Sequence, residues 1–293
     1  LTGDDVSDFF ILTHLFPDIK FNQFSRFHRY HSRFAELNRF TDNGWDFHDL
    51  TAYHFDTEKL AEVFYDVCLR NGVEFVDDKY IRANKSNDGN ITSLKCENGT
   101  HEADLFVDCT GFHSELLGKV MGVHYNSYAD TLINHRAIAA KIPYTDKNKQ
   151  LTSYTNNVTM NNGWCYEIPL WDGMSVGYVH SLKFTTPEKI DKEFIDRYGV
   201  EPTKGVEFRT GRYEKAWVKN VASVGLSFGF IEPLEATGLA SIVTNVFRLL
   251  ESLSTHLSPN SFDREVFNHA CATELDNSKT FIDMHYATSH KSD

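Results

Sequence analysis

The residues best suited to chemistry lie in one short stretch, SFGFIEPLEATGLASI at 227–242. It places Glu232 and Glu235 directly before a Thr-Gly pair and an apolar run with helical spacing. Thr237 is a suitable N-cap, and Gly238 lets a ligand approach the backbone because glycine has no Cβ. The free N–H groups and the positive end of the helix dipole suit an anion or an electron-rich ring edge. The stretch therefore predicts an anion site with a carboxylate beside it.

The two glutamates have two interpretations on these grounds alone. Glu232 and Glu235 can complement the helix dipole, which stabilises a helix by ~0.3–1 kcal/mol per charge. Alternatively, a glutamate in an aromatic, poorly hydrated site is poised to accept or hold a proton. Their spacing does not decide between a structural and a chemical role.

Length, charge and cysteine content limit the class of protein. The 293 residues suit one large or two modest domains with a substantial core. The net charge of −12 argues against nucleic-acid binding, which needs a concentrated basic surface. The 5 cysteines are far apart and never form C-x-x-C, so we interpret them as reduced thiols rather than disulfides or a zinc site. With no signal peptide and no apolar run of ~18 residues, a cytoplasmic protein without a membrane span is expected.

The first half of the chain predicts a helix followed by strands. The apolar spacing in TEKLAEVFYDVCLR predicts a helix from Thr57 to Arg70, with Asp56 or Thr57 as its N-cap. VEFVDDKYIRA and ITSLKCENG read as strands joined by a turn with Asp-Gly at its tip. A third strand, Ala103 to Val107, runs into DCTGF, a pattern by which doubly wound sheets present a cofactor, although ordinary loops share it.

The second half predicts a sheet and two long helices. AIAAKIPY, TSYTNNVTM, CYEIPL and MSVGYVHSLKF suit an antiparallel sheet, and ASVGLSFGF reads as one further strand. From Leu239, LASIVTNVFRLLESL has a broad apolar stripe that predicts a buried helix, and the tail from Phe262 to His285 predicts another. Near the start of the chain, FSRFHRYHSRF at 24–34 mixes basic and aromatic residues, and we interpret it as structural or substrate-lining.

Several segments, in order, resemble those of the flavin-dependent halogenases, the tryptophan halogenase family. FIEPLEATGL is similar to the family signature EPLESTG, DLFVDCTGF (104–112) to its flavin-side strand and turn, and GWCYEIP (163–169) to its G-W-x-W-x-I-P. GYVHSLKF (177–184), the segment at 208–230, AYHFD (52–56) and HYATS (285–289) fall in the family's order. The resemblance runs from about residue 50 to residue 293, which is most of the chain. Five motifs in the same order are also far more specific than a single one.

The resemblance implies a fold and a domain organisation. The fold class is α/β and FAD-dependent monooxygenase-like, with a doubly wound sheet, a β-meander, an antiparallel sheet and a helical substrate region. Residues 50–293 would be the flavin-binding halogenase core. Residues 1–49 would be an irregular, substrate-side segment of an incomplete N-terminal region.

The resemblance also implies a reaction. In this family, reduced flavin reacts with dioxygen to give a flavin hydroperoxide, and a bound halide (chloride, bromide or iodide) attacks it to form hypohalous acid. That oxidant crosses a tunnel to a lysine and halogenates an electron-rich aromatic ring. FAD, in its reduced form FADH2, and a halide ion are therefore the expected cofactors.

Each motif would then have a role. Glu235 would be the catalytic residue that helps position the oxidant and takes up the ring proton as general base. Thr237 and Gly238 would bind the halide through backbone N–H groups. Gly111 and Phe230, together with Thr237 and Gly238, would contact the cofactor.

The tunnel and substrate residues follow in the same way. Gly163, Trp164, Tyr166, Ile168 and Pro169 would belong to the tunnel motif, which keeps the substrate away from the flavin. His285 and Tyr286 match the substrate region of the family. No metal ligand is expected.

The sequence departs from the family pattern at several positions. Ala236 stands where the family usually has serine, and Tyr166 replaces the second tryptophan of the tunnel motif. The FAD-binding glycine loop G-x-G-x-x-G is absent from this chain, and no residue matches the catalytic lysine. We interpret these two absences as an incomplete sequence rather than a degenerate one.

The expected partners follow from these observations. Lys291 and Ser292 stand where an Arg-Glu pair is common, which leaves a tryptophan ammonium without a carboxylate, so we expect an indole, tryptophan-like or phenolic substrate. A separate NADH-dependent flavin reductase would supply reduced flavin. Two alternatives stay open, a flavin-dependent aromatic hydroxylase and a catalytically degenerate flavin-binding homologue. A homo-oligomer is also left open.

Overall fold

The computed structural model describes residues 14–15, 37–38, 52–255 and 259–289. The FSRFHRYHSRF segment and nearly all of the predicted irregular region at 1–49 lie outside these residues. Contacts divide the chain into two compact units, one of residues 1–66, 139–158 and 165–177, the other of 67–138, 159–164 and 178–293. The predicted boundary at residue 50 remains a prediction.

The first predicted helix forms as α4, over Thr57–Arg70. Asp56 is its N-cap, because Oδ1 accepts hydrogen bonds from the backbone N–H groups of Glu58 and Lys59 at 3.0 and 3.4 Å. None of its residues is buried among the described parts of the chain, and Phe64 is 60% exposed. The apolar spacing therefore predicted the helix correctly. It did not predict that the apolar face of the helix is exposed among the described residues.

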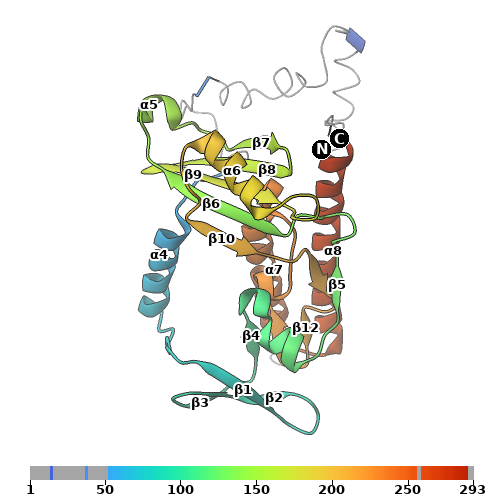
Figure 1. The fold of residues 1–293 in the computed structure, drawn as a ribbon. Helices are drawn as coiled ribbons and strands as arrows, with labels where there is room; N and C mark the ends of the chain where they lie inside the picture. Colours follow the sequence, from blue (N-terminus) through green and yellow to red (C-terminus); the bar gives the residue numbers. More distant parts are fainter. Residues whose placement is uncertain (1–13, 16–36, 39–51, 256–258, 290–293) are drawn as a thin grey trace. The chain divides into compact units, whose positions relative to one another are not determined.

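The middle of the chain forms the five-stranded sheet β10-β6-β9-β8-β7 (Figure 1). Its strands are β6 (Arg136–Ile142), β7 (Asn156–Met160), β8 (Gly163–Leu170), β9 (Gly173–His180) and β10 (Lys204–Glu207). β7 is joined to β8, and β8 to β9, by tight turns, which make these neighbours antiparallel. The predicted antiparallel arrangement is thereby confirmed for β7, β8 and β9, and β10 is an addition to the predicted strands. The short helix α5 (Lys147–Gln150) connects β6 to β7.

The helix α6, Pro187–Tyr198, packs on the second unit's end of this sheet. Its Ile190 and Phe194 are buried, with 1% and 0% exposure. Glu193 accepts hydrogen bonds from the Tyr178 hydroxyl and the Asn161 N–H, both at 2.8 Å. These bonds satisfy the tight turn between β7 and β8.

A three-stranded antiparallel meander opens the second unit. It contains β1 (Tyr80–Lys85), β2 (Ile91–Cys96) and β3 (Thr100–Glu102) in that order. Gly89 adopts φ +87 in the turn between β1 and β2, as the Asp-Gly pair predicts. The predicted strand VEFVDDKYIRA forms only from Tyr80 onward, because β1 is an edge strand and no described strand pairs with the residues before it.

A parallel strand pair forms the base of the site. β4 (Phe106–Asp108) pairs with β13 (Val221–Ser223), and β12 (Trp217–Val218) lies on the other side of β13. The predicted strand from Ala103 to Val107 is thus shifted toward its carboxyl end, since pairing with β13 begins only at Phe106. This parallel pair is the part of the expected doubly wound sheet that the described residues contain.

The predicted strand ASVGLSFGF is wrong as a single element. β13 ends at Ser223, a 3-10 turn (η5) covers Gly225–Ser227, and β14 (Gly229–Phe230) joins a different sheet, β14-β11-β5. β11 is Gly211–Tyr213 and β5 is Tyr125–Ser127. Gly225 has φ +73, a left-handed conformation that breaks the extended chain.

Both predicted carboxyl-terminal helices form, as α7 (Thr237–Thr255) and α8 (Ser261–Ala287). Asn260 is the N-cap of α8 and forms a capping box. Its side chain accepts hydrogen bonds from the N–H groups of Phe262 and Asp263, and its own N–H donates to the Asp263 carboxylate. Figure 1 shows α8 as a long, straight helix.

The hydrophobic core of the second unit lies between these helices and the parallel strands. Phe267, Cys271 and Leu275 of α8 pack in one cluster with Leu249 of α7, Trp217 and Phe228. Burying each large side chain contributes ~1.5–3 kcal/mol.

The apolar stripe of α7 lies mostly outside that core. Leu239, Val243 and Phe247 are 50%, 53% and 67% exposed, and no described residue covers them. The prediction that this stripe is buried is therefore wrong for the described residues, because α7 contacts the core through Asn245 and Leu249 instead.

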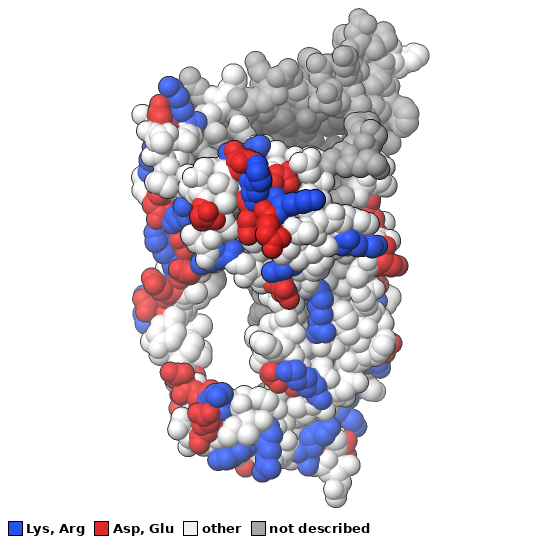
Figure 2. Space-filling model, viewed as in Figure 1, with Lys and Arg blue, Asp and Glu red and all other residues white. Residues whose placement is uncertain are grey.

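The surface carries both signs of charge. Figure 2 shows Lys and Arg interspersed with Asp and Glu over the face in view. This interspersion agrees with a net charge of −12 that is spread out rather than concentrated. No helix among the described residues is long and apolar enough to cross a membrane.

Candidate active site

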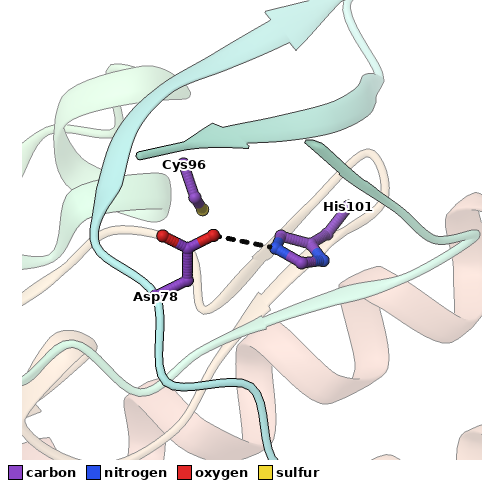
Figure 3. A group of neighbouring side chains, drawn as sticks. All are labelled: Asp78, Cys96 and His101. Carbon is purple, nitrogen blue, oxygen red and sulfur yellow. Dashed lines mark hydrogen bonds and ion pairs between the residues drawn. The ribbon is translucent and has the colours of Figure 1, made fainter. Parts of the chain in front are cut away.

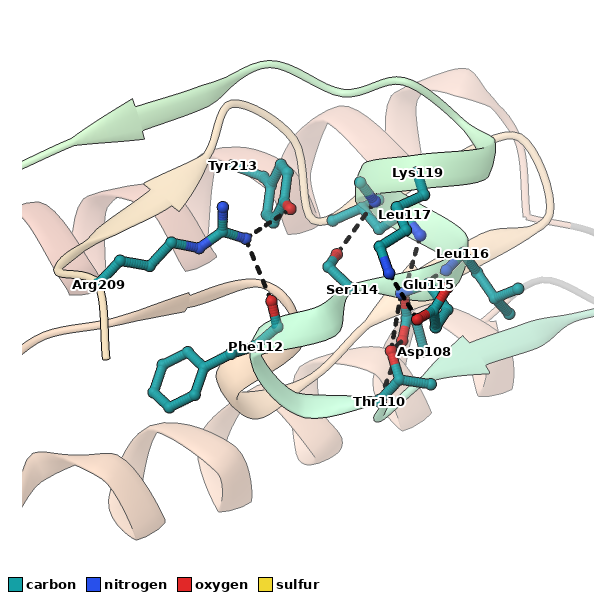
Figure 4. Close-up of polar contacts among 11 residues, drawn as sticks. Asp108, Thr110, Phe112, Ser114, Glu115, Leu116, Leu117, Lys119, Arg209 and Tyr213 are labelled. Atoms are coloured by element: carbon teal, nitrogen blue, oxygen red, sulfur yellow. Dashed lines mark hydrogen bonds and ion pairs between the residues drawn. The ribbon is translucent and has the colours of Figure 1, made fainter. Parts of the chain in front are cut away.

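The turn that follows β4 is organised by Asp108, whose side chain is fully buried. One carboxylate oxygen accepts hydrogen bonds from the Leu116 and Leu117 N–H groups, both at 2.8 Å. The other accepts from the N–H and the hydroxyl of Thr110, at 3.0 and 2.6 Å (Figure 4). Asp108 therefore fixes the turn and the π-helical segment η4, Glu115–Val120, with one side chain.

Ser114 and Ser227 connect this turn to the segment after β13. Ser114 has φ 42 and caps η4 by accepting from the Gly118 N–H, while its hydroxyl donates to the Ser227 carbonyl at 2.8 Å. The Ser227 hydroxyl in turn donates to the Asp108 carbonyl. Because β4 and β13 are parallel, their carboxyl ends lie at the same edge, which is where doubly wound sheets bind ligands.

The expected cofactor residues Gly111 and Phe230 lie near one another at this edge. Gly111 begins the 3-10 turn η3 (Gly111–His113) with φ +64, and a Cβ built on it would meet nothing within 4 Å. The Phe112 ring packs edge-on against Phe230, with centroids 5.4 Å apart. η5 contacts η3, β14 and α7, so the structure brings Gly111, Phe230 and the start of α7 into one neighbourhood.

Arg209 places a positive charge close to the turn. Its guanidinium donates to the Tyr213 hydroxyl at 2.8 Å (Figure 4). It lies 4.1 Å from the centroid of the Tyr125 ring. It also approaches the Phe112 carbonyl at 3.4 Å. A guanidinium held on an aromatic face keeps its charge and its direction.

The stretch SFGFIEPLEATGLASI (227–242), called the opening motif below, contains a strained turn before α7. Pro233–Glu235 is a 3-10 turn (η6), and Ala236 follows it in a left-handed conformation with φ 52 and ψ 29. A residue with a Cβ in this region costs ~1–2 kcal/mol, and such strain gathers at functional sites. Thr237 and Gly238 are the first residues of α7, so their N–H groups have no acceptor within the helix. The predicted helix begins at Thr237, and anion binding at its end stays a prediction.

Glu232 is fully buried and hydrogen-bonded beside this turn. Asn134 donates to its Oε2 at 2.8 Å, and the Tyr286 hydroxyl donates to its Oε1. Burial raises the pKa of Glu232 above its ordinary value, although hydrogen bonds from Tyr286, Asn134 and Trp164 oppose that effect. Burial, followed by the Glu232 charge, raises the pKa of Tyr286, so the phenol remains a donor.

Glu235 has a different environment, although it comes only one 3-10 turn later. Its side chain is 38% exposed, and its Oε1 lies 2.7 Å from Nε2 of His285. The other ring nitrogen of His285 faces the Phe281 carbonyl at 2.8 Å. A half-exposed carboxylate oriented by an imidazole is suited to accepting a proton from a bound molecule.

The first two residues of the tunnel motif, Gly163 and Trp164, lie in the second unit. Gly163 has φ +156, and a Cβ on it would lie 2.0 Å from the Val179 carbonyl oxygen, so any other residue would push β8 away from β9. Trp164 is 6% exposed, and its indole N–H favours the charged form of Glu232. The structure thus places Trp164 beside Glu232.

The remaining residues of that motif belong to the first unit. Tyr166 is partly buried, and its ring occupies the space that a side chain at Gly177 would need. Burial raises the pKa of Tyr166. The Pro169 carbonyl lies 3.1 Å from Nδ1 of His54, and Ile168 is partly buried between these residues on β8. Their role in a tunnel stays a prediction.

One further group, Asp78, Cys96 and His101, has donor atoms within 4.8 Å of one another (Figure 3). Asp78 accepts hydrogen bonds from the N–H groups of Lys79 and Asn98, at 2.8 and 3.0 Å, and lies 3.4 Å from Nε2 of His101. These contacts explain why the three side chains lie together, because they stabilise the turn between β2 and β3.

Sequence reasoning missed several residues that build the site. Asp108 is part of the DCTGF motif, and its place after an apolar strand was the available signal. Asn134 and Arg209 carry no local pattern, because they reach the site only through sheet pairing and side-chain direction. Asn134, for example, contacts Glu232 98 positions away.

Comparison with known proteins agrees with this geometry. The sequence model of the tryptophan halogenase family matches residues 19–293. Tryptophan 7-halogenase KtzQ of Kutzneria sp. (strain 744) is 34% identical over 249 residues, which are 83% of this chain and 46% of that protein. Tryptophan 7-halogenase RebH of Lentzea aerocolonigenes is 32% identical over 83% of this chain and 47% of its own length.

Solved structures show the same similarity. The apo structure of VirX1 superposes with a TM-score of 0.90 and 32% identity, over 96% of this chain and 57% of that one. MibH, a tryptophan 5-halogenase, superposes with a TM-score of 0.77 and 32% identity, over 82% of this chain and 46% of that one. The chain spans about half the length of the curated relatives it matches. Its α/β fold, its ordered motifs and these matches together establish that the chain belongs to the tryptophan halogenase family.

Proposed function

We propose that this protein is a FADH2- and O2-dependent halogenase of an electron-rich aromatic substrate. The observation that carries the proposal is the turn before α7, where the half-exposed Glu235 precedes the strained Ala236 and the free helix end at Thr237. An anion-binding helix end beside a carboxylate is what halogenation of a ring needs, because one holds the halide and the other takes the proton.

The residues of this chain fit the ring side of FAD. Gly111 leaves open backbone at the edge of the parallel strands, and Phe230 contributes an aromatic wall next to it. Together with Thr237 and Gly238 they would hold the flavin ring. The G-x-G-x-x-G loop that binds the pyrophosphate does not occur in this sequence. When bound, reduced FAD and dioxygen supply the oxidising power that converts the halide to an electrophile.

The chain's own groups would perform the remaining steps. The N–H groups of Thr237 and Gly238 hold the halide at the positive end of α7. Glu235 accepts the proton that the halogenated ring carbon loses, and the C–H electron pair returns to the ring. Trp164, Tyr166, Ile168 and Pro169 would separate the substrate from the flavin.

Substrate and partners belong to the same proposal. The tryptophan halogenases among the relatives favour an indole, and a phenol remains within the same chemical class. A separate NADH-dependent reductase would deliver reduced flavin. A cytoplasmic location agrees with Cys68, Cys96, Cys109, Cys165 and Cys271, which the structure does not pair in disulfides.

The test is mass spectrometry of reactions that contain the protein, FAD, a flavin reductase with NADH, air, bromide, catalase and a panel of indoles and phenols. A product with the bromine isotope doublet is expected, and Glu235→Gln should lower its rate by about 100-fold or more, as for loss of a general base. A product that gains one oxygen would indicate an aromatic hydroxylase. Flavin binding without any product would indicate a degenerate homologue.

A further inference from the structure

The last turn of α8 contacts the turn before α7 through two adjacent side chains. Tyr286 donates to the buried Glu232, and His285 faces the half-exposed Glu235. Both glutamates flank Pro233 in the opening motif. α8 therefore contacts the candidate catalytic turn at each of its ends.

The geometry of His285 fixes its direction. Its Nδ1 lies 2.8 Å from the Phe281 carbonyl, one helical turn earlier, and its ring packs edge-on against the Phe281 ring at 4.7 Å. A carbonyl oxygen only accepts hydrogen bonds, so Nδ1 carries a proton. Nε2 is then the atom directed at Glu235.

The pair holds one further proton between Nε2 and Oε1, which lie 2.7 Å apart. Glu235 is a base only as a carboxylate, and in that arrangement both ring nitrogens of His285 are protonated and Nε2–H donates to Oε1. Oε1 is therefore occupied by His285. No described residue donates to Oε2, so that oxygen remains available to a bound molecule.

We propose that His285 is a positioning residue that holds Oε1 of Glu235 and leaves Oε2 to receive the ring proton of the substrate. The proposal rests on the proposed function, since it assigns a partner to its general base. It replaces the substrate contact that the family resemblance implies for His285. The side chains are 32% and 38% exposed, so a substrate can reach the pair.

Tyr286 and Asn134 fix the other end of the same turn. Asn134 donates to both Glu232 and the Tyr286 hydroxyl, at 2.8 and 2.9 Å, in a buried network. A fully buried and hydrogen-bonded Glu232 holds the turn's backbone in place. Because that end does not move freely, the short Glu235 side chain depends on His285 alone for its direction.

The experiment is a double-mutant cycle in the halogenase reaction with bromide. His285→Ala should lower kcat about tenfold with KM for the aromatic substrate within about twofold, and His285→Gln, which retains an N–H donor, should recover most of the rate. In the Glu235→Gln background the same His285 substitutions should change kcat by less than about twofold. His269→Gln, an exposed histidine on the same helix, is the matched control.

Other outcomes of the cycle would overturn the proposal. A rise in KM with kcat unchanged would make His285 a substrate contact. An equal loss of kcat in both backgrounds would show that His285 does not act through Glu235. Thermal unfolding of each variant separates these outcomes from a loss of folded protein.

A measurement without turnover distinguishes this proposal from the proposed function. The side-chain ¹⁵N signals of His285 should shift in Glu235→Gln and stay unchanged in Glu201→Gln, whose glutamate is exposed and distant in sequence. Unshifted signals would overturn the pairing whatever the activity. Shifted signals without any halogenated product would reject the proposed function and leave the pairing of His285 with Glu235 supported.

Discussion

Two glutamates in one short motif have opposite surroundings. Glu232 is fully buried among donors, whereas Glu235 is 38% exposed and has one histidine partner. The 3-10 turn that starts at Pro233 separates them, because it turns successive side chains to different directions. The same chemical group therefore anchors the turn at Glu232 and remains partly open to solvent at Glu235.

Glu232→Gln should change how stability depends on pH. The folded pKa of Glu232 is raised, so the folded state binds this proton more tightly than the unfolded state. This contribution to the free energy of unfolding is fully present below pH 4.5, the ordinary pKa of a glutamate. It is lost as the pH rises through the higher pKa of the folded state. The wild type should thus lose free energy of unfolding relative to Glu232→Gln between pH 4.5 and neutrality.

Chemical denaturation at a series of pH values measures this difference. Glu97→Gln, at an exposed position, is the control and should run parallel to the wild type. If the difference in free energy of unfolding between the wild type and Glu232→Gln stays constant across these pH values, the pKa of Glu232 is not raised.

At the scale of elements, the carboxyl ends of β4 and β13 form the edge at which we propose that the flavin binds. The two strands contribute only short runs, but Asp108 converts their end into a fixed turn through four hydrogen bonds. Two of these bonds go to the buried N–H groups of Leu116 and Leu117, which must be satisfied inside the protein. The shape of the turn after β4 therefore depends on one carboxylate.

Asp108→Asn should loosen that turn. The amide replaces one accepting oxygen by an N–H₂ group, so two backbone or side-chain donors lose their acceptor at a cost of ~1–3 kcal/mol each. We expect a lower free energy of unfolding and at least about tenfold weaker flavin binding, measured by denaturation and by flavin fluorescence. Asp104→Asn, an exposed residue shortly before β4, should leave both unchanged. Unaltered flavin binding in Asp108→Asn would show that the turn lies away from the ring.

The sequence predicted these elements unevenly. Helices α4, α7 and α8 follow from apolar spacing and caps, and the β1–β2 turn from its Asp-Gly pair. The break of ASVGLSFGF at Gly225 did not follow, since a small-residue run fits a strand and a turn equally well. The exposed stripe of α7 did not follow either, because periodicity shows which face is apolar and not what covers it.

The same limit applies to the site. Thr237, Gly238 and the two glutamates could be nominated from the sequence because a helix end and its anion chemistry are local features. Asn134, Arg209 and the contact of His285 with Glu235 depend on pairing over long stretches of chain, which spacing does not encode. For His285, the family resemblance supplied the position but not the partner.

For the molecule as a whole, acidic side chains outnumber basic ones, and several aspartates are stabilised in their charged form. Hydrogen bonds from Arg212 are the largest cause that lowers the pKa of Asp276, and hydrogen bonds also contribute to lowering the pKa of Asp78 and Asp172. Each such group binds fewer protons in the folded state than in the unfolded state. Their contributions are present above about 3.8 and are lost as pH falls through the lowered folded pKa values.

Asp276→Asn should reduce this sensitivity to acid. Arg212 bonds both carboxylate oxygens, at 2.9 and 2.8 Å, and Tyr128 donates to one of them at 2.5 Å, so the variant is less stable at neutral pH. The gap to the wild type should narrow as pH falls below 3.8, the ordinary value. Thermal unfolding between pH 3 and 7 measures it, with the exposed Asp77→Asn as control. A gap that widens in acid would refute the role of Asp276.

The bond between Ser114 and Ser227 also has a consequence for biosynthesis. These partners are 113 positions apart, and Asp108 and Ser227 are 119 apart, whereas β1, β2 and β3 are joined by short turns. A chain leaving the ribosome can therefore close the meander early, while the turn after β4 waits until Ser227 has emerged. Local contacts form fast and distant ones slowly, so the turn after β4 is among the last parts to mature. A nascent chain halted before Ser227 would hold a folded meander and an unformed turn after β4.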